Sequence, residues 1–568
     1  MHRRGAQALG WLGALLLGCA ACGAERVEAT ARRPSPSASS GAHERVQAPP
    51  PEAASTASGG TAEAPEAPPP APYARAERVD LVLRGGLVVD GSGGAARSAD
   101  VVVHGGRVEH VGEVAAGQTA AATLELNGQV VAPGFVDLHA HADPLGPSEF
   151  LFAQGVTTIL VGQDGASPAP RIGPFLDRVE AARPRLNVAT LVGHATAAAE
   201  ARIARHRPAG EPELDRLRVV VARGLDEGAF GLSLGLEYEP GSLASLEELT
   251  VAAEPVGARQ GVVMAHLRSE DDEAIDASIA ELCEVARRSG AKAHVAHLKI
   301  VLGRGEARAQ ALLEALERER ARGVALSADL YPYDASYTTY AILFPPFARP
   351  PHAYAEATRK RGDELRAWLR RRIEQRGGPE AMLLGTGPHA GKTLAELAKG
   401  RGQPFEEVLV ELGPNGGSAA YFVMDEAVVE ALARAPFVAF GTDGGASSSH
   451  PRGYGSFARV FAKLVRERGA LSLEEAVRKA ARLPWQTLGL DAERGLVAPG
   501  YVADLVVFDP ARFIDRASFV APRRRAEGVR AVYVAGKLAY TDGQLTKERA
   551  GVVLRAPKRA TVGARRTP

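Results

Sequence analysis

Histidine and aspartate side chains stand at the ends of several short apolar runs of this 568-residue chain. These residue types bind zinc and similar divalent ions. His139 and His141 lie two positions apart after one such run, and side chains at that spacing on a strand point the same way. Two ligands of one metal need such a shared direction.

The complete set is spread over most of the chain, and the histidine pair alone is weak evidence. Any one of these residues also suits a hydrogen-bonded position in the core, but all of them recur at the ends of apolar runs. The recurrence predicts a site for one or two divalent ions, with zinc as the expected metal. The candidate ligands are His139, His141, Asp164, His266, His297 and Asp443.

The elements that position these residues follow a repeating pattern. Eight apolar runs, most of them ending in a polar residue, alternate with helical patterns such as 269–289 and 306–322. This alternation predicts an α/β fold, a TIM barrel, over residues 133–489, and such barrels carry their chemistry at the carboxyl ends of the strands. The candidate ligands fall at or just past the ends of strands one, two, five, six and eight. The runs lie at 136–139, 158–162, 188–192, 230–233, 262–266, 293–297, 325–329 and 438–443.

Strands seven and eight are separated by far more sequence than one helix needs. We therefore expect an insertion at about residues 345–435 that hangs over the barrel mouth. Short β-type runs with glycine turns occupy both ends of the folded region, at 79–132 and 490–556. These two segments are expected to build one small β-sandwich.

Composition excludes several classes of protein. Lys+Arg total 68 and Asp+Glu 67, and a net charge of +1 gives no reason to expect nucleic acid or an anionic membrane surface as partner. Three cysteines exclude a disulfide framework. No apolar run reaches the roughly 18–20 residues that span a bilayer.

The first 76 residues have their own character. Residues 1–22 combine a basic start with a short apolar stretch, which is typical of a secretory signal, and residues 16–19 (Leu-Leu-Gly-Cys) resemble a bacterial lipobox. That resemblance implies cleavage before Cys19 and lipidation of this cysteine, so that the protein is exported and anchored to the cell envelope. Ordinary cleavage nearby, which yields a periplasmic or secreted protein, is the alternative. Residues 23–76 are rich in Pro, Ala and Ser and are predicted to be a disordered tether.

Several short motifs occur along the folded part of the chain. They are PGFVDLHAH at 133–141, GLSLGLEY at 231–238, HLR at 266–268, HLK at 297–299, YPY at 331–333, GTDG at 441–444 and HPR at 450–452. Together they resemble the amidohydrolase superfamily, specifically its D-aminoacylase (N-acyl-D-amino-acid deacylase) branch, from about residue 79 to 550. The resemblance implies a metal-dependent barrel with a small β-sandwich and hydrolysis of the amide bond of N-acyl-D-amino acids or similar small compounds. A hydantoinase, dihydroorotase or dipeptidase activity, or a non-catalytic surface-anchored binding module, are the alternatives.

The chain departs from that family at one metal ligand. The known deacylases carry a cysteine in the loop after strand two, whereas here the loop reads Gly-Gln-Asp-Gly and Asp164 takes the position. Many superfamily members bridge two metals with a carboxylated lysine on strand four. This chain has Ser233 and Glu237 there, so Glu237 is the rival of Asp164 as a bridging carboxylate.

The expected mechanism and substrate contacts follow from this arrangement. A bound metal lowers the pKa of water to roughly 7, and Asp443 takes the water proton and returns it to the departing amine. Arg268 and Lys299 each lie two residues past a ligand histidine, where they bind a substrate carboxylate or pair with a carboxylate of the barrel. The other expected substrate-binding residues are Tyr331, His450 and Arg452.

Overall fold

The computed structural model describes residues 72–350 and 352–557. The predicted signal segment, Cys19 and all but the last five residues of the predicted tether lie outside the described residues. In the part of the chain that is described, no helix has the length and apolar character needed to cross a membrane.

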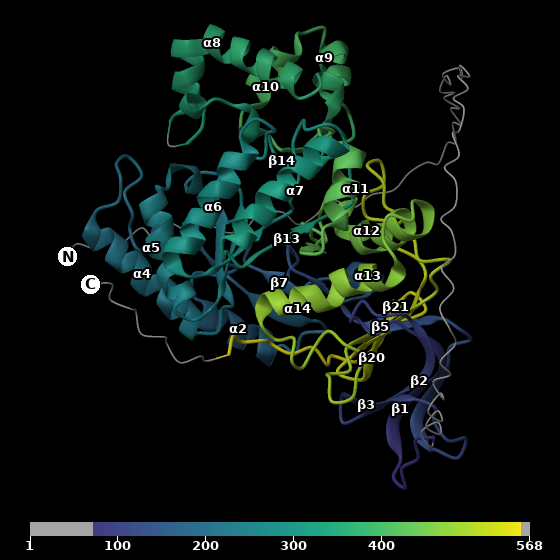
Figure 1. The fold of residues 1–568 in the computed structure, drawn as a ribbon. Coiled ribbons are helices and arrows are strands. Elements are labelled where there is room, and N and C mark those ends of the chain that lie inside the picture. The colour runs from purple at the N-terminus through teal and green to yellow at the C-terminus, as the bar shows by residue number, and fades with distance from the viewer. Residues whose placement is uncertain (1–71, 351, 558–568) are drawn as a thin grey trace, which may run out of the picture. The chain divides into compact units, whose positions relative to one another are not determined.

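The predicted eight-stranded barrel is confirmed (Figure 1). All neighbouring strands run parallel, in one sheet of order β17-β13-β12-β11-β10-β9 and another of order β6-β7-β8. The first and last barrel strands belong to different sheets, so the seam between them is closed by other contacts. The strands are β6 (Phe135–Asp137), β7 (Val156–Val161), β8 (Asn187–Thr190) with the short β9 (Val192–Gly193), β10 (Gly231–Gly235), β11 (Val262–His266), β12 (Lys292–Val295), β13 (Leu326–Leu330) and β17 (Val438–Phe440).

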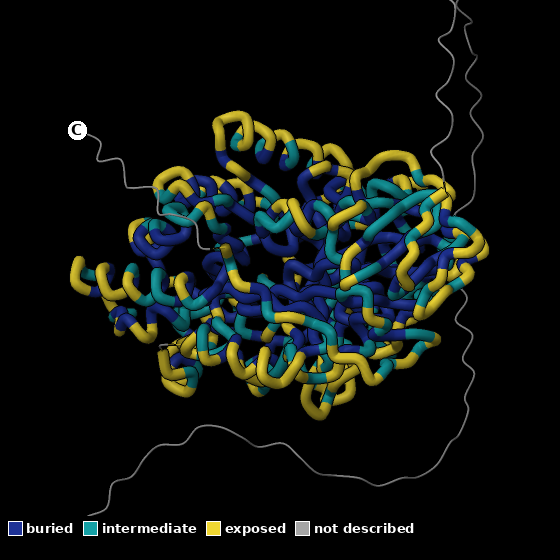
Figure 2. Tube along the Cα trace, turned by 90° about the horizontal axis from the view of Figure 1, so that it is seen from below, coloured by how far each residue is buried: buried dark blue, intermediate teal, exposed yellow. Residues whose placement is uncertain are grey.

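Helices cover the outside of the barrel because each has one apolar face. In α6 (Ile275–Ser289), residues Ile275, Ile279, Leu282 and Ala286 recur at helical spacing and are all buried. The other helices around the barrel are α1 (Glu149–Phe152), α2 (Ile172–Ala181), α3 (His194–Glu200), α4 (Glu211–Asp226), α5 (Leu246–Gly257), α7 (Gly305–Ala321), α11 (Glu426–Arg434), α12 (Arg452–Arg459), α13 (Leu473–Val477) and α14 (Leu483–Leu488). Figure 2 shows the result, a buried interior beneath exposed outer turns.

Segments from both ends of the folded region share one sheet of order β21-β20-β19-β18-β5-β1-β2-β3, with β4 paired to β1. The join is the antiparallel pair of β18 with β5, so the two segments fold as one unit. Alternate residues of these strands, such as Leu83, Val101 and Leu505, fill its apolar core. The strands are β1 (Val79–Val88), β2 (Arg97–His104), β3 (Arg107–Gly112), β4 (Ala120–Glu125), β5 (Val130–Pro133), β18 (Leu505–Phe508), β19 (Val529–Val534), β20 (Lys537–Thr541) and β21 (Gln544–Leu545).

The C-terminal segment leaves this sheet earlier than the predicted boundary at residue 556. Beyond β21 the chain returns to the amino end of the barrel, where the backbone of Leu554 donates to Val188 of β8 at 2.8 Å. The Leu554 side chain packs there in an apolar cluster that includes Phe230 and Trp485. Burial of that side chain explains why these last residues belong to the barrel rather than to the sandwich.

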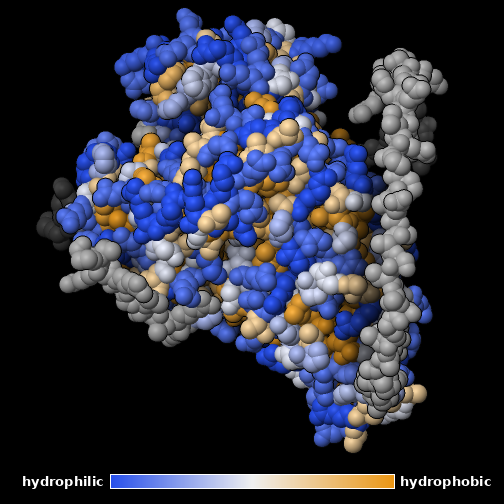
Figure 3. All heavy atoms as spheres, viewed as in Figure 1, coloured by the Kyte–Doolittle hydropathy of each residue, from blue (hydrophilic) through white to orange (hydrophobic). Residues whose placement is uncertain are grey.

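The insertion is a separate layer over the barrel mouth, at the top of Figure 1. It begins at Ser336, earlier than predicted, and ends before α11, which packs against α7 of the barrel. Its face in Figure 3 is mostly hydrophilic. The elements are a small antiparallel sheet of β14 (Ser336–Thr339), β16 (Ser418–Tyr421) and β15 (Met382–Leu384), with α8 (Tyr354–Gln375), α9 (Leu394–Arg401) and α10 (Phe405–Leu412).

Candidate metal centre

The seam of the barrel carries the first group of candidate ligands. His139 and His141 follow β6, and Asp443 follows β17. The two loops are joined by backbone hydrogen bonds, from Asp443 to His139 at 2.8 Å and from His141 to Gly444 at 2.9 Å. The loop bonds that close the barrel therefore also bring these three side chains together.

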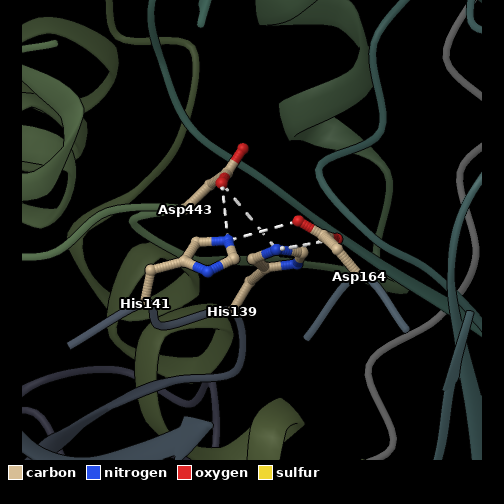
Figure 4. A group of neighbouring side chains, drawn as sticks. All are labelled: His139, His141, Asp164 and Asp443. Atoms are coloured by element: carbon tan, nitrogen blue, oxygen red, sulfur yellow. Dashed lines mark ion pairs between the residues drawn. The ribbon is translucent and has the colours of Figure 1, made fainter. Parts of the chain in front are cut away.

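The structure brings His139, His141, Asp164 and Asp443 into one group whose ligand atoms all lie within 4.8 Å of one another (Figure 4). The Nε2 atom of His141 is 3.3 Å from both Asp164 Oδ2 and Asp443 Oδ1. The Nε2 atom of His139 is 3.4 Å from Asp164 Oδ1 and 3.8 Å from Asp443 Oδ1. The imidazole and carboxylate atoms converge on one small space, as the ligands of a divalent ion do.

Asp164 also belongs to a second group with His266 and His297. Its Oδ1 atom is 3.9 Å from His266 Nδ1 and 3.9 Å from His297 Nε2, and these two ring nitrogens are 2.9 Å apart. All six predicted ligands therefore meet, with Asp164 between the two groups. That central place suits a carboxylate that bridges two ions.

Unpartnered buried atoms mark the centre of this arrangement. Among the described residues, both ring nitrogens of His139 and the Oδ1 atom of Asp164 are buried without a hydrogen-bond partner. A buried polar atom without a partner is costly, and a bound cation would satisfy the His139 Nε2 atom and the Asp164 Oδ1 atom, which face each other at 3.4 Å. The donor set of imidazole and carboxylate fits zinc.

Electrostatics favour the ionised form of both aspartates of the first group. Burial raises the pKa of Asp164, but the neighbouring His139 outweighs it and holds that pKa below its ordinary value. Burial raises the pKa of Asp443, but the charges of Arg452 and His297 outweigh it and hold that pKa below its ordinary value. Burial lowers the pKa of His141, but the carboxylates of Asp164 and Asp443 raise it to about 10. His141 is therefore protonated without a metal, and metal binding must release that proton.

Two glutamates hold the outer nitrogens of the second group. Glu237 Oε2 lies 3.0 Å from His266 Nε2, the nitrogen that points away from Asp164. Glu270 Oε1 lies 3.0 Å from His297 Nδ1 and 2.5 Å from Lys299 Nζ. Glu237 thus contacts the back of a ligand histidine, which is the usual place of a residue that orients a ligand. Sequence reasoning missed Glu270, because it lies in a loop with no periodic relation to His266.

A cavity of about 470 Å³ opens beside the metal ligands, and the insertion forms part of its wall. Lys299, Tyr331 and Arg452 line it, as the sequence predicts for substrate-binding residues. The Arg452 guanidinium is 2.7 Å from Asp443 Oδ2 and lies 4.6 Å from the centre of the Tyr331 ring. Its Nε atom is buried without a partner among the described residues. Arg376, which follows α8, also lines this cavity and carried no signal in the sequence.

Two of the predicted substrate-binding residues lie elsewhere. Arg268 does not line the catalytic cavity; it pairs with Glu281 at 2.8 Å and donates to two backbone carbonyls. Strand β11 ends at His266, so the alternation that predicted a shared direction does not extend to Arg268. His450 is fully buried, with Nε2 3.0 Å from the Ala335 carbonyl oxygen and Nδ1 accepting the Arg452 amide at 3.0 Å. It therefore supports Arg452 from behind.

Comparison with known proteins gives the following similarities. The model of the Amidohydrolase family matches residues 352–540. An N-acyl-D-glutamate deacylase of Alcaligenes xylosoxydans xylosoxydans is 34% identical over 84% of this chain and 97% of its own length. A D-aminoacylase of the same organism is 32% identical over 84% of this chain and 97% of its own length. The crystal structure of an N-acyl-D-glutamate deacylase from Bordetella bronchiseptica, complexed with zinc and a phosphonate mimic of the tetrahedral intermediate, has a TM-score of 0.74 at 30% identity and covers 84% of this chain and all of that one.

Proposed function

Since the chain belongs to the D-aminoacylase (N-acyl-D-amino-acid deacylase) branch of the amidohydrolase superfamily, we propose that it hydrolyses the amide bond of N-acyl-D-amino acids with one or two bound zinc ions. The observation that carries this proposal is the convergence of six metal-binding side chains around buried atoms that lack partners.

The metal ligands are His139, His141, Asp164, His266, His297 and Asp443, with Asp164 between the two groups. When bound, zinc supplies Lewis acidity, which makes hydroxide from water at neutral pH and polarises the amide carbonyl. The proton transfers are carried out by Asp443. Asp443 lies at the cavity wall, so its carboxylate can accept the proton of the attacking water and deliver it to the departing amine.

The substrate carboxylate is bound by cations on the same side of the cavity as Asp443. Arg452 offers an unpartnered Nε atom beside the Tyr331 ring, and a guanidinium binds carboxylates through charge-assisted hydrogen bonds. Lys299 lines the same cavity but already donates to Glu270. Arg452 pairs with Asp443 through Nη1 but keeps its Nε atom without a partner among the described residues, so it is the main carboxylate-binding group. The Tyr331 hydroxyl, which is buried without a partner among the described residues, is a second donor.

The test is metal analysis of the purified protein together with a substrate panel. We expect one or two zinc ions per chain and turnover of N-acyl-D-amino acids that clearly exceeds turnover of N-acyl-L-amino acids, hydantoins and dipeptides. Faster hydrolysis of a cyclic amide would overturn the assignment to linear substrates. A protein that binds no zinc and turns over nothing would overturn the proposal of an enzyme.

We also propose that the protein is exported and anchored to the cell envelope through a lipidated Cys19, with residues 23–76 as a tether. The support is the basic and apolar start of the sequence and the lipobox-like tetrad that ends at this cysteine. Replacing Cys19 with serine should move the protein from the membrane fraction to a soluble or unprocessed form. Unchanged fractionation would favour plain secretion or another anchor.

A further inference from the structure

Two buried aspartates lie beneath the metal ligands without facing the cavity. Asp137 is the last residue of β6 and Asp329 belongs to β13, and neither lines the catalytic cavity. Their side chains are fully enclosed. We propose that both are positioning residues, whose carboxylates fix the backbone that presents the metal ligands. This inference rests on the proposed function, because it assigns the two residues to the proposed metal centre.

Asp137 joins the two sides of the barrel seam. Its carboxylate accepts hydrogen bonds from the Thr442 amide at 2.9 Å, from the Thr442 hydroxyl at 2.5 Å and from the His139 amide at 3.2 Å. The Thr442 hydroxyl oxygen in turn accepts the Gly444 amide at 3.2 Å. One carboxylate thus fixes His139 directly and Asp443 through the residues on either side of it.

Asp329 performs the corresponding task for the second ligand group. Its Oδ1 atom accepts the His297 amide at 2.9 Å, and its backbone carbonyl accepts the Leu298 amide at 2.6 Å. Its Oδ2 atom lies 2.7 Å from His294 Nε2, and the other ring nitrogen of His294 lies 2.8 Å from Ser327 Oγ. His294 therefore orients Asp329, which in turn holds the backbone of a ligand.

The backbone at these ligands needs such support. His297 and Asp443 adopt left-handed conformations, with φ values of 36° and 46°. Residues other than glycine persist in this region only where their surroundings fix them, at a cost of about 1–3 kcal/mol each. Gly441 lies between the two carboxylates, since a Cβ atom there would be 3.3 Å from Asp329 Oδ1 and 3.4 Å from Asp137 Oδ1. Both carboxylates thus belong to one layer that supports both ligand groups.

Variants of Thr442 give the sharpest test of the positioning role proposed for Asp137. Thr442→Val keeps the shape of the side chain but removes the hydroxyl, while Thr442→Ser keeps the hydroxyl. Zinc affinity is measured on chelator-stripped protein by competition with a chromophoric chelator, and kcat and KM on an N-acyl-D-amino acid. We expect about a 10–100-fold loss of zinc affinity in Thr442→Val, the range found for groups that orient ligands. Its kcat should fall while its KM stays close to that of the wild type, and Thr442→Ser should behave like the wild type.

Asp329 is tested by a second pair of variants. Asp329→Ala removes both acceptors and should lower zinc affinity. Asp329→Asn keeps an oxygen for the His297 amide, and His294 can move its proton to the nitrogen that faces Ser327, so this variant should retain most of the affinity. A loss in the alanine variant that the asparagine variant does not repair would contradict the proposed contact.

The control is Asp504→Asn, which changes another buried aspartate whose side chain bonds to Asn187, Arg494 and the Ala535 amide rather than to the backbone of a ligand. Asp504 accepts the Ala535 amide at 2.8 Å and pairs with Arg494 at 2.5 Å. We expect this variant to lower the melting temperature and to leave zinc affinity unchanged. If Thr442→Val also loses only thermal stability, the positioning role is refuted while the metal centre stands. If the wild-type protein binds no zinc, the proposed function itself fails.

Discussion

The two ends of the barrel are built from the same strands, but polar side chains converge at one end and apolar side chains fill the other. At the carboxyl end, histidines and aspartates converge and several of their buried atoms have no partner among the described residues. At the amino end, an apolar cluster that includes Leu554, Phe230 and Trp485 fills the interior. The C-terminal segment of the chain completes that cluster, so one end is closed by packing and the other stays open for chemistry.

A buried lysine at the amino end has backbone acceptors close to its amine. Lys479, in the helical segment Arg478–Arg482, is enclosed and donates to the carbonyls of Ala435 and Val438, the latter at 2.9 Å. Arg452 at the carboxyl end is equally enclosed but keeps its Nε atom unpartnered. Among these two buried basic residues, only the one beside the cavity keeps a donor without a partner in the described part of the chain.

The largest expected effects come from the aspartates at the carboxyl end. Asp443→Asn keeps the shape and one oxygen but cannot accept a proton, so kcat should fall about 10²–10⁴-fold. Zinc at the second ligand group should be retained, because Asp443 does not belong to that group. Asp164→Ala should be at least as inactive because it is metal-poor, since Asp164 belongs to both ligand groups. Zinc per chain and turnover are measured in parallel. Full zinc occupancy and activity in Asp164→Ala would refute its central role.

Substitutions at the amino end of the barrel should change the stability of the protein rather than its activity. Leu554→Ala removes apolar contacts from the closed end and should lower the free energy of unfolding by about 2–3 kcal/mol, as measured by urea denaturation. Leu554→Met, which conserves volume, is the matched control and should cost less than about 1.5 kcal/mol. Zinc content and kcat of the folded variants should be unchanged. A loss of zinc would mean that the two ends are coupled.

A variant of Glu237 distinguishes a residue that binds the metal from one that orients a ligand histidine. Because it contacts His266 Nε2, Glu237→Gln should weaken zinc binding only about 10–100-fold and leave zinc bound at saturating concentration. A bridging carboxylate would instead be indispensable. If Glu237→Gln loses all zinc while Asp164→Ala keeps it, the bridging role moves to Glu237.

The smallest expected effect is a pH dependence of the free energy of unfolding, caused by Lys479 at the amino end of the barrel. Burial lowers the pKa of Lys479 to about 7, from an ordinary value of 10.5. Between those values the unfolded chain binds a proton that the folded chain has released, so the free energy of unfolding rises with pH. The contribution is about 1.5 kcal/mol between pH 7 and pH 8.5, and it should be missing from the same curve of Lys479→Met. Parallel curves for the two proteins would contradict the lowered pKa.

Sequence spacing predicted the barrel and brought the six ligand candidates to the correct strands, because period and length constrain strands strongly. It did not predict where side chains point beyond a strand. Arg268 lies two residues past the end of β11, in a loop whose direction depends on its pairing with Glu281. Glu270 and Arg376 were missed because their positions depend on loops and on the insertion, whose contacts are distant in sequence. The return of Leu554 to the barrel was missed for the same reason, because its contacts are also distant in sequence.

The closure of the barrel seam has a consequence for synthesis of the chain. Asp137 and Thr442, which join the two sides of the seam, are 305 residues apart in sequence. At about 5–20 residues per second, roughly 15–60 s of translation separate them. During that interval the emerging chain already presents His139 and His141 but lacks Asp443. The first ligand group can therefore be completed only after most of the polypeptide has been made.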